Sequence, residues 1–235
     1  MRIFGIMKKF YKNEKNLSLI IPFKNREEHL EGLWKNLTKC LENINTEIII
    51  VEQANKPCNP ALLKNIGAKN SKNADYFCFH DVDMVPYLET ADYSYFNGVV
   101  HLATMASQYK YKMPYTEYFG GVLIADKEEF LRTNGFSNEF WGWGAEDDNF
   151  RDRCLFNLVN ISSRECKYEC FDHGRNMVEA VKNADILARE RRDKELFIKS
   201  LKSGISDLDS KYKILYEKEN RISEKLNLRL LNVEV

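Results

Sequence analysis

Residues 17–23 read LSLIIPF, a continuous apolar run that closes on a proline. A run of this length predicts a strand that is buried on both faces. We expect the following loop to begin at Pro22, because proline removes a backbone donor. Apolar residues then recur at helical spacing across residues 26–44, and the isoleucine-rich residues 47–51 predict a second buried strand.

The next segment of the chain repeats this pattern. Pro60 is placed to open a short apolar helix through residue 68, and residues 76–79 (YFCF) predict a third strand. Strand, helix, strand, helix and strand follow one another over about 65 residues, which favours a parallel α/β sheet with right-handed crossovers. Ligands of such sheets bind beyond the carboxyl ends of the strands.

Composition limits the class of protein. The chain has 235 residues, 44% hydrophobic and 30% charged, which is typical of a globular protein and excludes a disordered one. This length fits one large α/β domain or two small ones. Basic and acidic residues both number 35, so the zero net charge does not indicate nucleic-acid binding. No apolar run is long enough to span a membrane, and six scattered cysteines are typical of reduced thiols in a cytoplasmic protein.

Two polar groups fall at the ends of predicted strands. Asn25 and Arg26 follow the first strand, and Asp81 and Asp83 follow the third. In an extended segment the two aspartates lie on one face with Val82 turned away, which suits a hard divalent cation bound to phosphate oxygens. The alternative is a surface turn with two solvated carboxylates.

Residues 141–148 read WGWGAEDD and form the densest cluster of the chain. Indole rings stack on sugars and bases, and the interleaved glycines permit close approach of the backbone. Asp147 and Asp148 precede a predicted helix over residues 149–158, whose N-terminus favours negative charge. Helix capping beside a packed tryptophan would explain one or two of these acids, whereas the whole cluster indicates function.

The rest of the chain has weaker patterns. Residues 178–201 are charged and compatible with a helix, and residues 212–217 and 228–235 alternate as in a final hairpin. A zinc site is a further possibility, although its spacing is not typical of zinc ligands. Its candidate ligands are Cys166, Cys170 and His173, with Cys154 nearby.

Four motifs together resemble the β-1,4-galactosyltransferase family, glycosyltransferase family 7. They are IIPFKNREEHL (20–30), FCFHDVDMVP (77–86), YFGG (118–121) and NGFSNEFWGWGAEDDNF (134–150). The last motif is long and specific, and the likeness covers nearly the whole chain. It implies an α/β GT-A glycosyltransferase fold, with a Rossmann-like nucleotide-binding half fused to an acceptor-binding half.

The resemblance also implies how the chain is divided. Residues 1–235 would form a single catalytic domain, with the nucleotide-sugar half at about 15–110 and the acceptor half and mobile lid at about 111–190. A C-terminal helix and hairpin would occupy about 191–235. Because the chain begins almost at the family's first catalytic strand, we expect a soluble, cytoplasmic member of bacterial or viral type.

The same resemblance also implies roles for individual residues. Donor contacts would come from Pro22, Phe23, Arg26, Asp81, Val82, Asp83, Tyr118, Gly121, Trp143 and Glu146. Acceptor contacts would come from Tyr115, Trp143, Asp147 and Asp148. Asp147 would also be the general base, and Asp83 and His173 would hold Mn²⁺ with Cys170 as a further ligand. A lid over residues 171–188, hinged at Gly174, would exclude water.

Three positions depart from the family pattern. Cys170 stands where animal members often carry a methionine ligand, which leaves other divalent metals open. Cys58-Asn59-Pro60 replaces a Phe-Asn-Arg motif, so an arginine that would contact the donor is lost. Asn149 replaces the final acid of the family's EDDD run, a position other than that of the base.

These residues predict an inverting, Mn²⁺-dependent transfer of galactose from UDP-galactose to a GlcNAc- or glucose-terminated glycan in β-1,4 linkage. Tyr118 favours this donor, since family members with a smaller residue there tend to admit UDP-GalNAc. The alternatives are a UDP-GalNAc or other UDP-hexose transferase, a non-catalytic sugar-nucleotide or glycan-binding protein, and a metal-dependent phosphohydrolase.

The expected partners are a UDP-sugar and a glycan or lipid-linked sugar acceptor, and no nucleic acid. Lys8, Lys9 and Lys12 lie among apolar residues, which leaves open a peripheral contact with an anionic membrane. The alternative is an ordinary solvated N-terminus.

Overall fold

The computed structural model describes residues 15–172, 174 and 177–235. Its strands are β1 (Leu17–Phe23), β2 (Thr46–Gln53), β3 (Tyr76–His80), β4 (Met84–Pro86), β5 (Val99–His101), β6 (Met105–Ala106), β7 (Val122–Asp126), β8 (Ile161–Ser163), β9 (Lys167–Cys170), β10 (Lys213–Arg221) and β11 (Leu226–Glu234). Its α-helices are α1 (Glu27–Cys40), α2 (Pro60–Lys69), α3 (Lys127–Arg132), α4 (Glu146–Phe156), α5 (Met177–Arg192) and α6 (Lys194–Ser200). Two short 3-10 helices are η1 (Ser107–Tyr109) and η2 (Ile205–Asp207).

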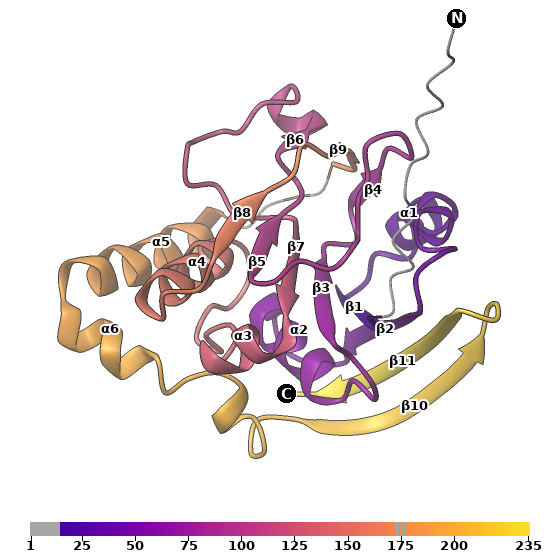
Figure 1. The fold of residues 1–235 in the computed structure, drawn as a ribbon. Coiled ribbons are helices and arrows are strands. Elements are labelled where there is room, and N and C mark those ends of the chain that lie inside the picture. Colours follow the sequence, from indigo (N-terminus) through magenta and orange to yellow (C-terminus); the bar gives the residue numbers. More distant parts are fainter. Residues whose placement is uncertain (1–14, 173, 175–176) are drawn as a thin grey trace, which may run out of the picture.

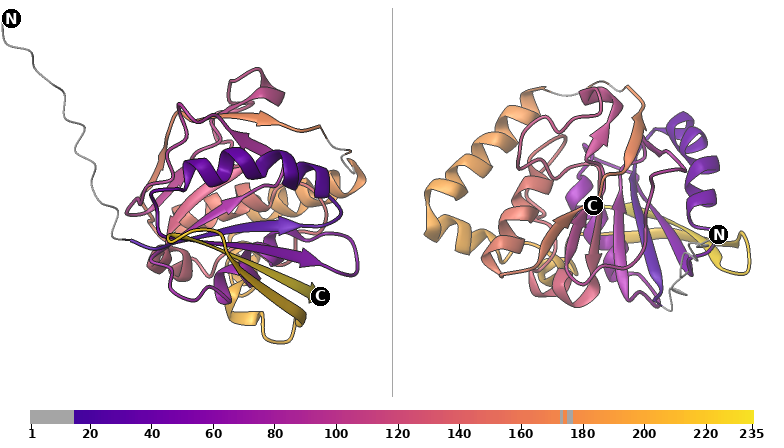
Figure 2. Two further views of the ribbon diagram at one scale, coloured as in Figure 1. Left: turned by 90° about the vertical axis from the view of Figure 1, so that its right-hand side faces the viewer. Right: turned by 45° about the horizontal axis from the view of Figure 1, so that its top comes forward.

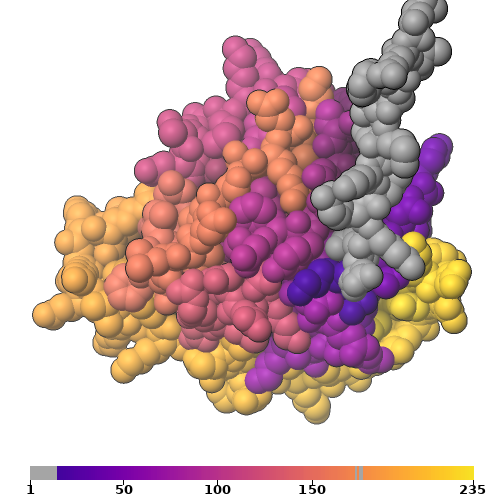
Figure 3. All heavy atoms as spheres, viewed as in Figure 1, coloured from indigo at the N-terminus to yellow at the C-terminus, as the bar shows by residue number. Residues whose placement is uncertain are grey.

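Within the described residues, eight strands form one mixed sheet in the order β10-β11-β2-β1-β3-β7-β5-β8 (Figure 1). β1 pairs in parallel with β2 and β3, which confirms the parallel arrangement predicted from the sequence. β7 runs antiparallel to β3, so its first residues lie at the edge where β3 ends. A smaller sheet, β4-β9-β6, lies at the top of Figure 1. The β5 and β8 segments pair in parallel and lie side by side in Figure 3.

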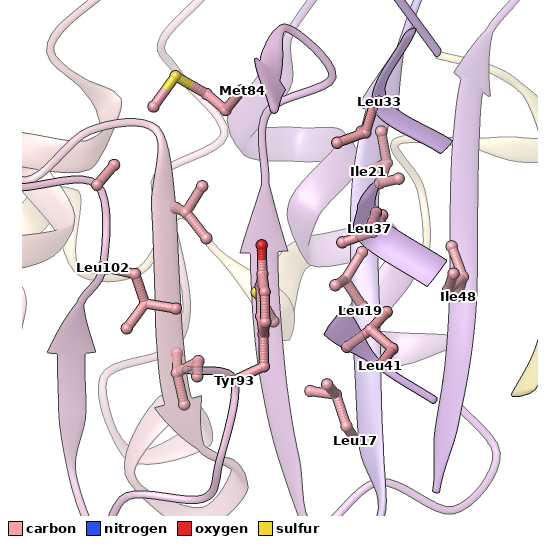
Figure 4. Close-up of a cluster of buried hydrophobic side chains, with 14 of the residues drawn as sticks. Leu17, Leu19, Ile21, Leu33, Leu37, Leu41, Ile48, Met84, Tyr93 and Leu102 are labelled. Carbon is pink, nitrogen blue, oxygen red and sulfur yellow. The ribbon is translucent and has the colours of Figure 1, made fainter. Parts of the chain in front are cut away.

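Helices cover both faces of the large sheet, and the strand residues alternate between them. Leu19 and Ile21 pack with Leu33 and Leu37 of α1 in one buried cluster (Figure 4). Ile20 belongs to the other cluster, together with the apolar residues of α2. The left view of Figure 2 shows α1 lying across one face of the sheet. Burial on both faces explains why β1 reads as an unbroken apolar run.

The end of β1 differs from the prediction. Pro22 does not begin the loop, because the strand continues to Phe23 and the proline keeps its place opposite Val51 of β2. Proline is tolerated here because the pairing of β1 with β3 already ends at Ile20. Beyond that point the strand has one neighbour, and the missing backbone donor costs little.

The C-terminal prediction is confirmed in outline. β10 and β11 form the expected hairpin, and β11 also pairs in parallel with β2, so the end of the chain extends the sheet. The predicted helix at 178–201 is two helices, since Asp193 ends α5 and caps α6 by accepting from the backbone N–H of Glu195 and Leu196. In the part of the chain that the structure describes, none of the helices has the length and apolar character needed to cross a lipid bilayer. Lys8, Lys9 and Lys12 lie outside the described residues.

Candidate functional site

A cleft of about 860 Å³ opens where β1, β2 and β3 end. Loops from both halves of the sheet and one side of α5 enclose it. Most of the predicted site residues line this cleft: Pro22, Arg26, Asp81, Val82, Asp83, Tyr115, Tyr118, Gly121, Trp143, Glu146, Asp147 and Asp148. The structure therefore brings together residues that lie more than a hundred positions apart in the sequence.

Three predicted residues are not placed in the cleft lining. Phe23 is 5% exposed and belongs to the core cluster beneath α1, because successive strand residues point to opposite faces. Cys170 ends β9 and pairs with Met84 across the small sheet. His173 lies outside the described residues.

The Asp81-Val82-Asp83 segment is a turn, not the extended segment we expected. The backbone N–H of Met84 donates to the carbonyl of Asp81 at 3.2 Å, which closes the turn between β3 and β4. Val82 is 3% exposed and packs in the core cluster beneath α1, although it also borders the cleft. Asp83 forms an ion pair with Arg26 at 3.6 Å. The turn and the N-cap residue of α1 thus hold one carboxylate and one cation together at the rim of the sheet.

The tryptophan–glycine loop delivers three acids to the cleft. Gly142, Gly144 and Ala145 adopt left-handed backbone conformations with φ of 75°, 99° and 71°. α4 then begins at Glu146 rather than at the predicted Asn149, so all three acids lie in its first turn. The helix dipole favours negative charge at this position, which offsets part of the repulsion among the carboxylates.

α5 holds the same loop from the other side. The side-chain amide of Asn183 donates to the carbonyls of Trp141 at 2.9 Å and Trp143 at 3.2 Å. A Cβ atom at Gly142 would lie 2.9 Å from Cβ of Glu179, and the φ of 75° also favours glycine at this close approach. Most of the predicted lid segment, from residue 177 onward, is therefore helix packed on the tryptophan–glycine loop.

Lys64 is a site residue that the sequence analysis missed. It lies on α2, where residues 61–68 are all buried, and its side chain is only 2% exposed. Its Nζ lies 2.7 Å from Oδ1 of Asp147, 3.7 Å from Oε1 of Glu146 and 3.8 Å from Oδ1 of Asp81. The available signal was a lysine within the apolar run ALLKNIGA, since a helix buried all round offers it no polar face.

This cluster of one cation and three carboxylates has shifted proton affinities. Burial raises the pKa of Glu146 to about 8, with Asp147 adding to the rise and Lys64 opposing it. Burial also raises the pKa of Asp81, although 34% of its side chain remains exposed, which limits the shift. Burial alone would lower the pKa of Lys64, but Asp147, Asp81 and Glu146 raise it instead. The lysine therefore stays charged in the cluster.

Tyrosines form the opposite wall of the cleft. The hydroxyl of Tyr115 donates to Oδ2 of Asp148 at 2.8 Å. The Tyr118 ring packs edge-on against Tyr109, Tyr115 and His101, with ring centroids 5.4 to 5.6 Å apart. These contacts from three directions fix where Tyr118 enters the cleft.

Two of the departures from the family pattern have structural roles. Asn59 caps α2 by accepting from the backbone N–H of Leu62 at 2.9 Å, and Pro60 starts the helix as predicted. Asn149 is fully buried and faces away from the cleft lining, where it donates to Glu190 at 2.7 Å and accepts from Arg153 at 2.9 Å. Asn149 thus helps to attach α4 to α5.

Asp83 fits a hard divalent cation better than Cys170 does. Its carboxylate is 13% exposed and lines the cleft, and oxygen is the donor that Mn²⁺ prefers. Burial raises the pKa of the Cys170 thiol, and its Sγ contacts Sδ of Met84 at 3.3 Å. A protonated thiol is a poor ligand for a hard cation. Among the described residues, no group of three or more histidine, cysteine or acidic side chains gathers as a metal site.

The geometry separates Cys154 from the other candidate zinc ligands, of which His173 lies outside the described residues. Cys154 lies in the core cluster on the α2 side of the sheet, whereas Cys166 lies in the cluster on the α1 side. Two faces of one sheet cannot supply a common tetrahedral site. All six cysteines are unpaired in the structure.

Sequence comparisons point to one family. Residues 9–96 match the family profile described as the N-terminal region of glycosyl transferase group 7, and residues 100–175 match that described as the N-terminal domain of galactosyltransferase. Human β-1,4-galactosyltransferase 5 is 41% identical over 166 residues, which are 67% of this chain and 43% of that protein. Bovine β-1,4-galactosyltransferase 1 is 37% identical over 152 residues, or 62% of this chain and 38% of that protein. The chain thus spans less than half the length of these relatives.

Solved structures agree with this result. The catalytic domain of Drosophila β1,4-galactosyltransferase 7 in complex with xylobiose matches with a TM-score of 0.75 and 25% identity, over 94% of each chain. A mutant of that enzyme in complex with manganese, UDP-Gal and xylobiose matches with a TM-score of 0.66. This likeness confirms the α/β, GT-A-like fold expected from the sequence. The chain therefore belongs to glycosyltransferase family 7, the β-1,4-galactosyltransferase family.

Proposed function

We propose that the chain is an inverting β-1,4-galactosyltransferase that moves galactose from UDP-galactose to a sugar hydroxyl. The observation that carries this proposal is the single cleft that Arg26 and Asp83 share with the acids at the start of α4. A sugar transfer needs a site for the diphosphate and a base within reach of the same sugar. Family membership supports the same activity.

The donor lies, in this proposal, at the ends of β1 and β3. Arg26 is ion-paired with Asp83 at 3.6 Å, so a guanidinium suited to phosphate oxygens stands beside the carboxylate. Pro22 lines the cleft and would contact the nucleotide, whereas Phe23 supports this wall from the core. Gly121 lines the cleft with φ of 89°, and a Cβ there would lie 3.0 Å from Ala103 and from Met84, so the backbone conformation and the close packing favour glycine in this wall.

Asp147 acts as the general base of a single displacement. Its carboxylate takes the proton of the acceptor hydroxyl while that oxygen forms a bond to the anomeric carbon. The bond between this carbon and the diphosphate oxygen breaks at the same time, so UDP leaves and the configuration inverts. The first turn of α4 holds Asp147 in the cleft, where its carboxylate lies 2.7 Å from the ammonium group of Lys64.

The residues that would hold Mn²⁺ are Asp83 and His173. When bound there, the cation supplies positive charge that stabilises the leaving diphosphate. Arg26 adds to that charge from the protein side. A mutant of the Drosophila relative was solved with manganese and UDP-Gal, which supports a manganese site in this chain.

The acceptor occupies the side of the cleft formed by Tyr115, Trp143 and Asp148. The Tyr115–Asp148 pair offers a hydroxyl and a carboxylate to sugar hydroxyls, and the half-exposed Trp143 offers an apolar face. Small residues of α5, including Ala180 and Ala184, form the far wall. We propose a GlcNAc- or glucose-terminated glycan as the acceptor, carried on a lipid or a surface polysaccharide.

Tyr118 selects the donor sugar. Its ring is held by Tyr109, Tyr115 and His101, so it cannot move aside to admit a larger group. Glu146 lies in the same cleft and would contact the sugar hydroxyls. We therefore propose UDP-galactose, with UDP-GalNAc as the alternative donor.

The test is release of UDP from UDP-galactose with Mn²⁺, measured with and without GlcNAc. Release should rise when GlcNAc is added, and Asp147→Asn should lower it by roughly 10²- to 10⁴-fold because the proton acceptor is lost. The affinity of Asp147→Asn for UDP, measured by calorimetry, should remain that of the wild type. Asp193→Asn is the matched control, since it makes the same substitution at the cap of α6, where asparagine also caps well.

Other outcomes would identify the alternatives. Release of UMP or phosphate without an acceptor would indicate a phosphohydrolase, and UDP binding without turnover of any UDP-sugar would indicate a binding protein. Faster turnover of UDP-GalNAc than of UDP-galactose under matched conditions would overturn the donor assignment.

A further inference from the structure

We infer that Lys64 is the positioning residue of the transfer reaction, which holds the Asp147 carboxylate in the orientation that the acceptor hydroxyl needs. This inference rests on the proposed function, because it assigns Lys64 a role only through Asp147. Neither the motifs that carry the family resemblance nor the predicted site residues include Lys64.

The contact itself is short and buried. Lys64 Nζ lies 2.7 Å from Oδ1 of Asp147, and the exposed fractions of the two side chains are 2% and 13%. The same Nζ lies over the ring of Phe136, 5.0 Å from its centroid. A charge-assisted hydrogen bond in such surroundings is stronger than one in water, so it restricts the rotation of the carboxylate. With Oδ1 held in this way, Oδ2 is the oxygen that receives the acceptor proton.

A purely structural need would not place a lysine here. Residues 61–68 of α2 are all buried, and Leu62, Leu63 and Ile66 fill the surrounding core. Burying an ammonium group is unfavourable unless it is paired, and an apolar side chain of this size would pack at the same place. The cation is explained by what its end meets, namely the carboxylates of Asp147, Glu146 and Asp81.

Lys64 also links the two sides of the reaction. Asp147 belongs to α4, on the acceptor side of the proposed site, and Asp81 belongs to the β3–β4 turn on the donor side. A cation between them reduces the repulsion that would otherwise push the two carboxylates apart. Pro60, where the family resemblance leads us to expect an arginine, begins the same helix one turn earlier. α2 thus keeps a positive charge at the site, from a different position.

The experiment compares Lys64→Met with Lys69→Met. Lys64→Met keeps most of the length of the side chain and removes the charge, and we expect kcat to fall by about 100-fold, since small misplacements of a reacting group cost this much. The KM for UDP-galactose should change by less than about threefold, because the donor-side contact is the longer one. Lys69→Met makes the same change at the far end of α2, where the lysine pairs with Asp209, and kcat should not change.

A double-mutant cycle separates positioning from general damage. If Lys64 acts through Asp147, adding Lys64→Met to Asp147→Asn should lower the residual rate by less than about threefold. A further 100-fold loss in that background would overturn the inference. Lys64→Arg keeps the charge and should recover at least about tenfold of the kcat lost in Lys64→Met. If Lys64→Met does not fold, Lys64→Arg is the test variant instead. We then expect a kcat below that of the wild type and unchanged UDP binding.

The two proposals fail in different ways. If the wild-type chain transfers no sugar, the proposed function is overturned. If the wild-type chain is active, Asp147→Asn is inactive and Lys64→Met keeps full kcat, only the role of Lys64 is overturned.

Discussion

Two buried cationic side chains lie near opposite ends of the strands of the large sheet, and each has three carboxylates around it. Lys64 meets Asp147, Glu146 and Asp81 at the edge where the parallel strands end. Arg229 of β11 meets Glu47, Glu217 and Glu219 near the edge where β2 begins. The two clusters have the same number of carboxylates, but Lys72 also pairs with Glu219 in the Arg229 cluster, and the bonding of the two cations differs.

The Arg229 cluster is satisfied within the sheet. The guanidinium donates to Glu217 at 2.6 and 2.9 Å, to Glu47 at 2.9 Å and to the carbonyl of Asn70 at 2.6 Å. The pKa of Glu219 is lowered, chiefly by its hydrogen bond with Lys72. These contacts tie β10, β11 and β2 together, and nothing about them requires a ligand.

The Lys64 cluster is not satisfied in this way. One ammonium group faces three carboxylates, one short bond goes to Asp147, and burial raises the pKa of Glu146 to about 8. The three carboxyl groups open onto the cleft, where a cationic or hydrogen-bonding ligand would compensate them. The comparison teaches that a count of ion pairs does not separate the two clusters, whereas the hydrogen bonds that each cation makes do.

Acidification should produce the largest change in the free energy of unfolding. It should act through a residue at the end of the sheet that borders the cleft. Burial lowers the pKa of His80, the last residue of β3, from 6.5 to about 4. Its Nδ1 lies 2.9 Å from the carbonyl of Asp81 and its Nε2 lies 2.9 Å from the hydroxyl of Tyr93, which together suit a neutral ring. Between pH 6.5 and 4, His80 is protonated in the unfolded chain and neutral in the folded chain. The free energy of unfolding should therefore fall by about 3 kcal/mol over this range.

The measurement is the free energy of unfolding in urea at several pH values, for the wild type and His80→Gln. The variant should be less stable at pH 7 and should show a flatter dependence on pH between 6.5 and 4. If the slope of the free energy of unfolding against pH is unchanged in His80→Gln, another group is responsible for the loss of stability in acid.

Removing the structural cation should affect folding and spare catalysis. Arg229→Met leaves Glu47, Glu217 and Glu219 without their common partner, and we expect a loss of about 2–3 kcal/mol. This is below the cost for a fully buried pair, because 34% of the Glu217 side chain is exposed. The thermal midpoint should fall, and kcat of the folded enzyme should match wild type. A fall in kcat as large as that of Lys64→Met would remove the distinction between the clusters.

The same substitution in the two clusters should have opposite effects on stability. Because the pKa of Glu146 is raised from 4.5 to about 8, its contribution to stability is full below pH 4.5 and is lost as the pH rises toward 8. Glu146→Gln should therefore stabilise the protein by about 1–2 kcal/mol at pH 8 and by little at pH 5. Glu47→Gln weakens bonds to Arg229 and Ser18, and should destabilise it by about 1 kcal/mol at both pH values.

Chemical denaturation of both variants at pH 5 and pH 8 checks this pair of predictions. Destabilisation by Glu146→Gln at pH 8 would contradict the assignment of Glu146 as a strained site residue. Stabilisation by Glu47→Gln would contradict the structural role of the Arg229 cluster.

Much of the fold follows from local pattern. The apolar runs at 17–23, 47–51 and 76–79 are strands, and Pro60 begins a helix, because burial on both faces and a fixed φ act on a few adjacent residues. The prediction that polar residues meet at the carboxyl ends of these strands is also confirmed by the cleft. Errors appeared where a neighbouring strand decided the outcome, as at Pro22, or where a turn replaced an extended segment, as at Asp81.

The sequence by itself therefore determined the parallel α/β core, the family and the acidic cluster of residues 146–148, since each is written in short stretches of adjacent residues. Only the tertiary structure decided that Phe23 faces the core, that Asn149 joins α4 to α5 and that Lys64 reaches Asp147. Lys64 and Asp147 are 83 positions apart in the sequence. Periodicity predicts which face of a helix is buried, but it does not predict which side chain of another element that face contacts. The charge that completes the cluster depends on how α2 and α4 pack against the end of the sheet.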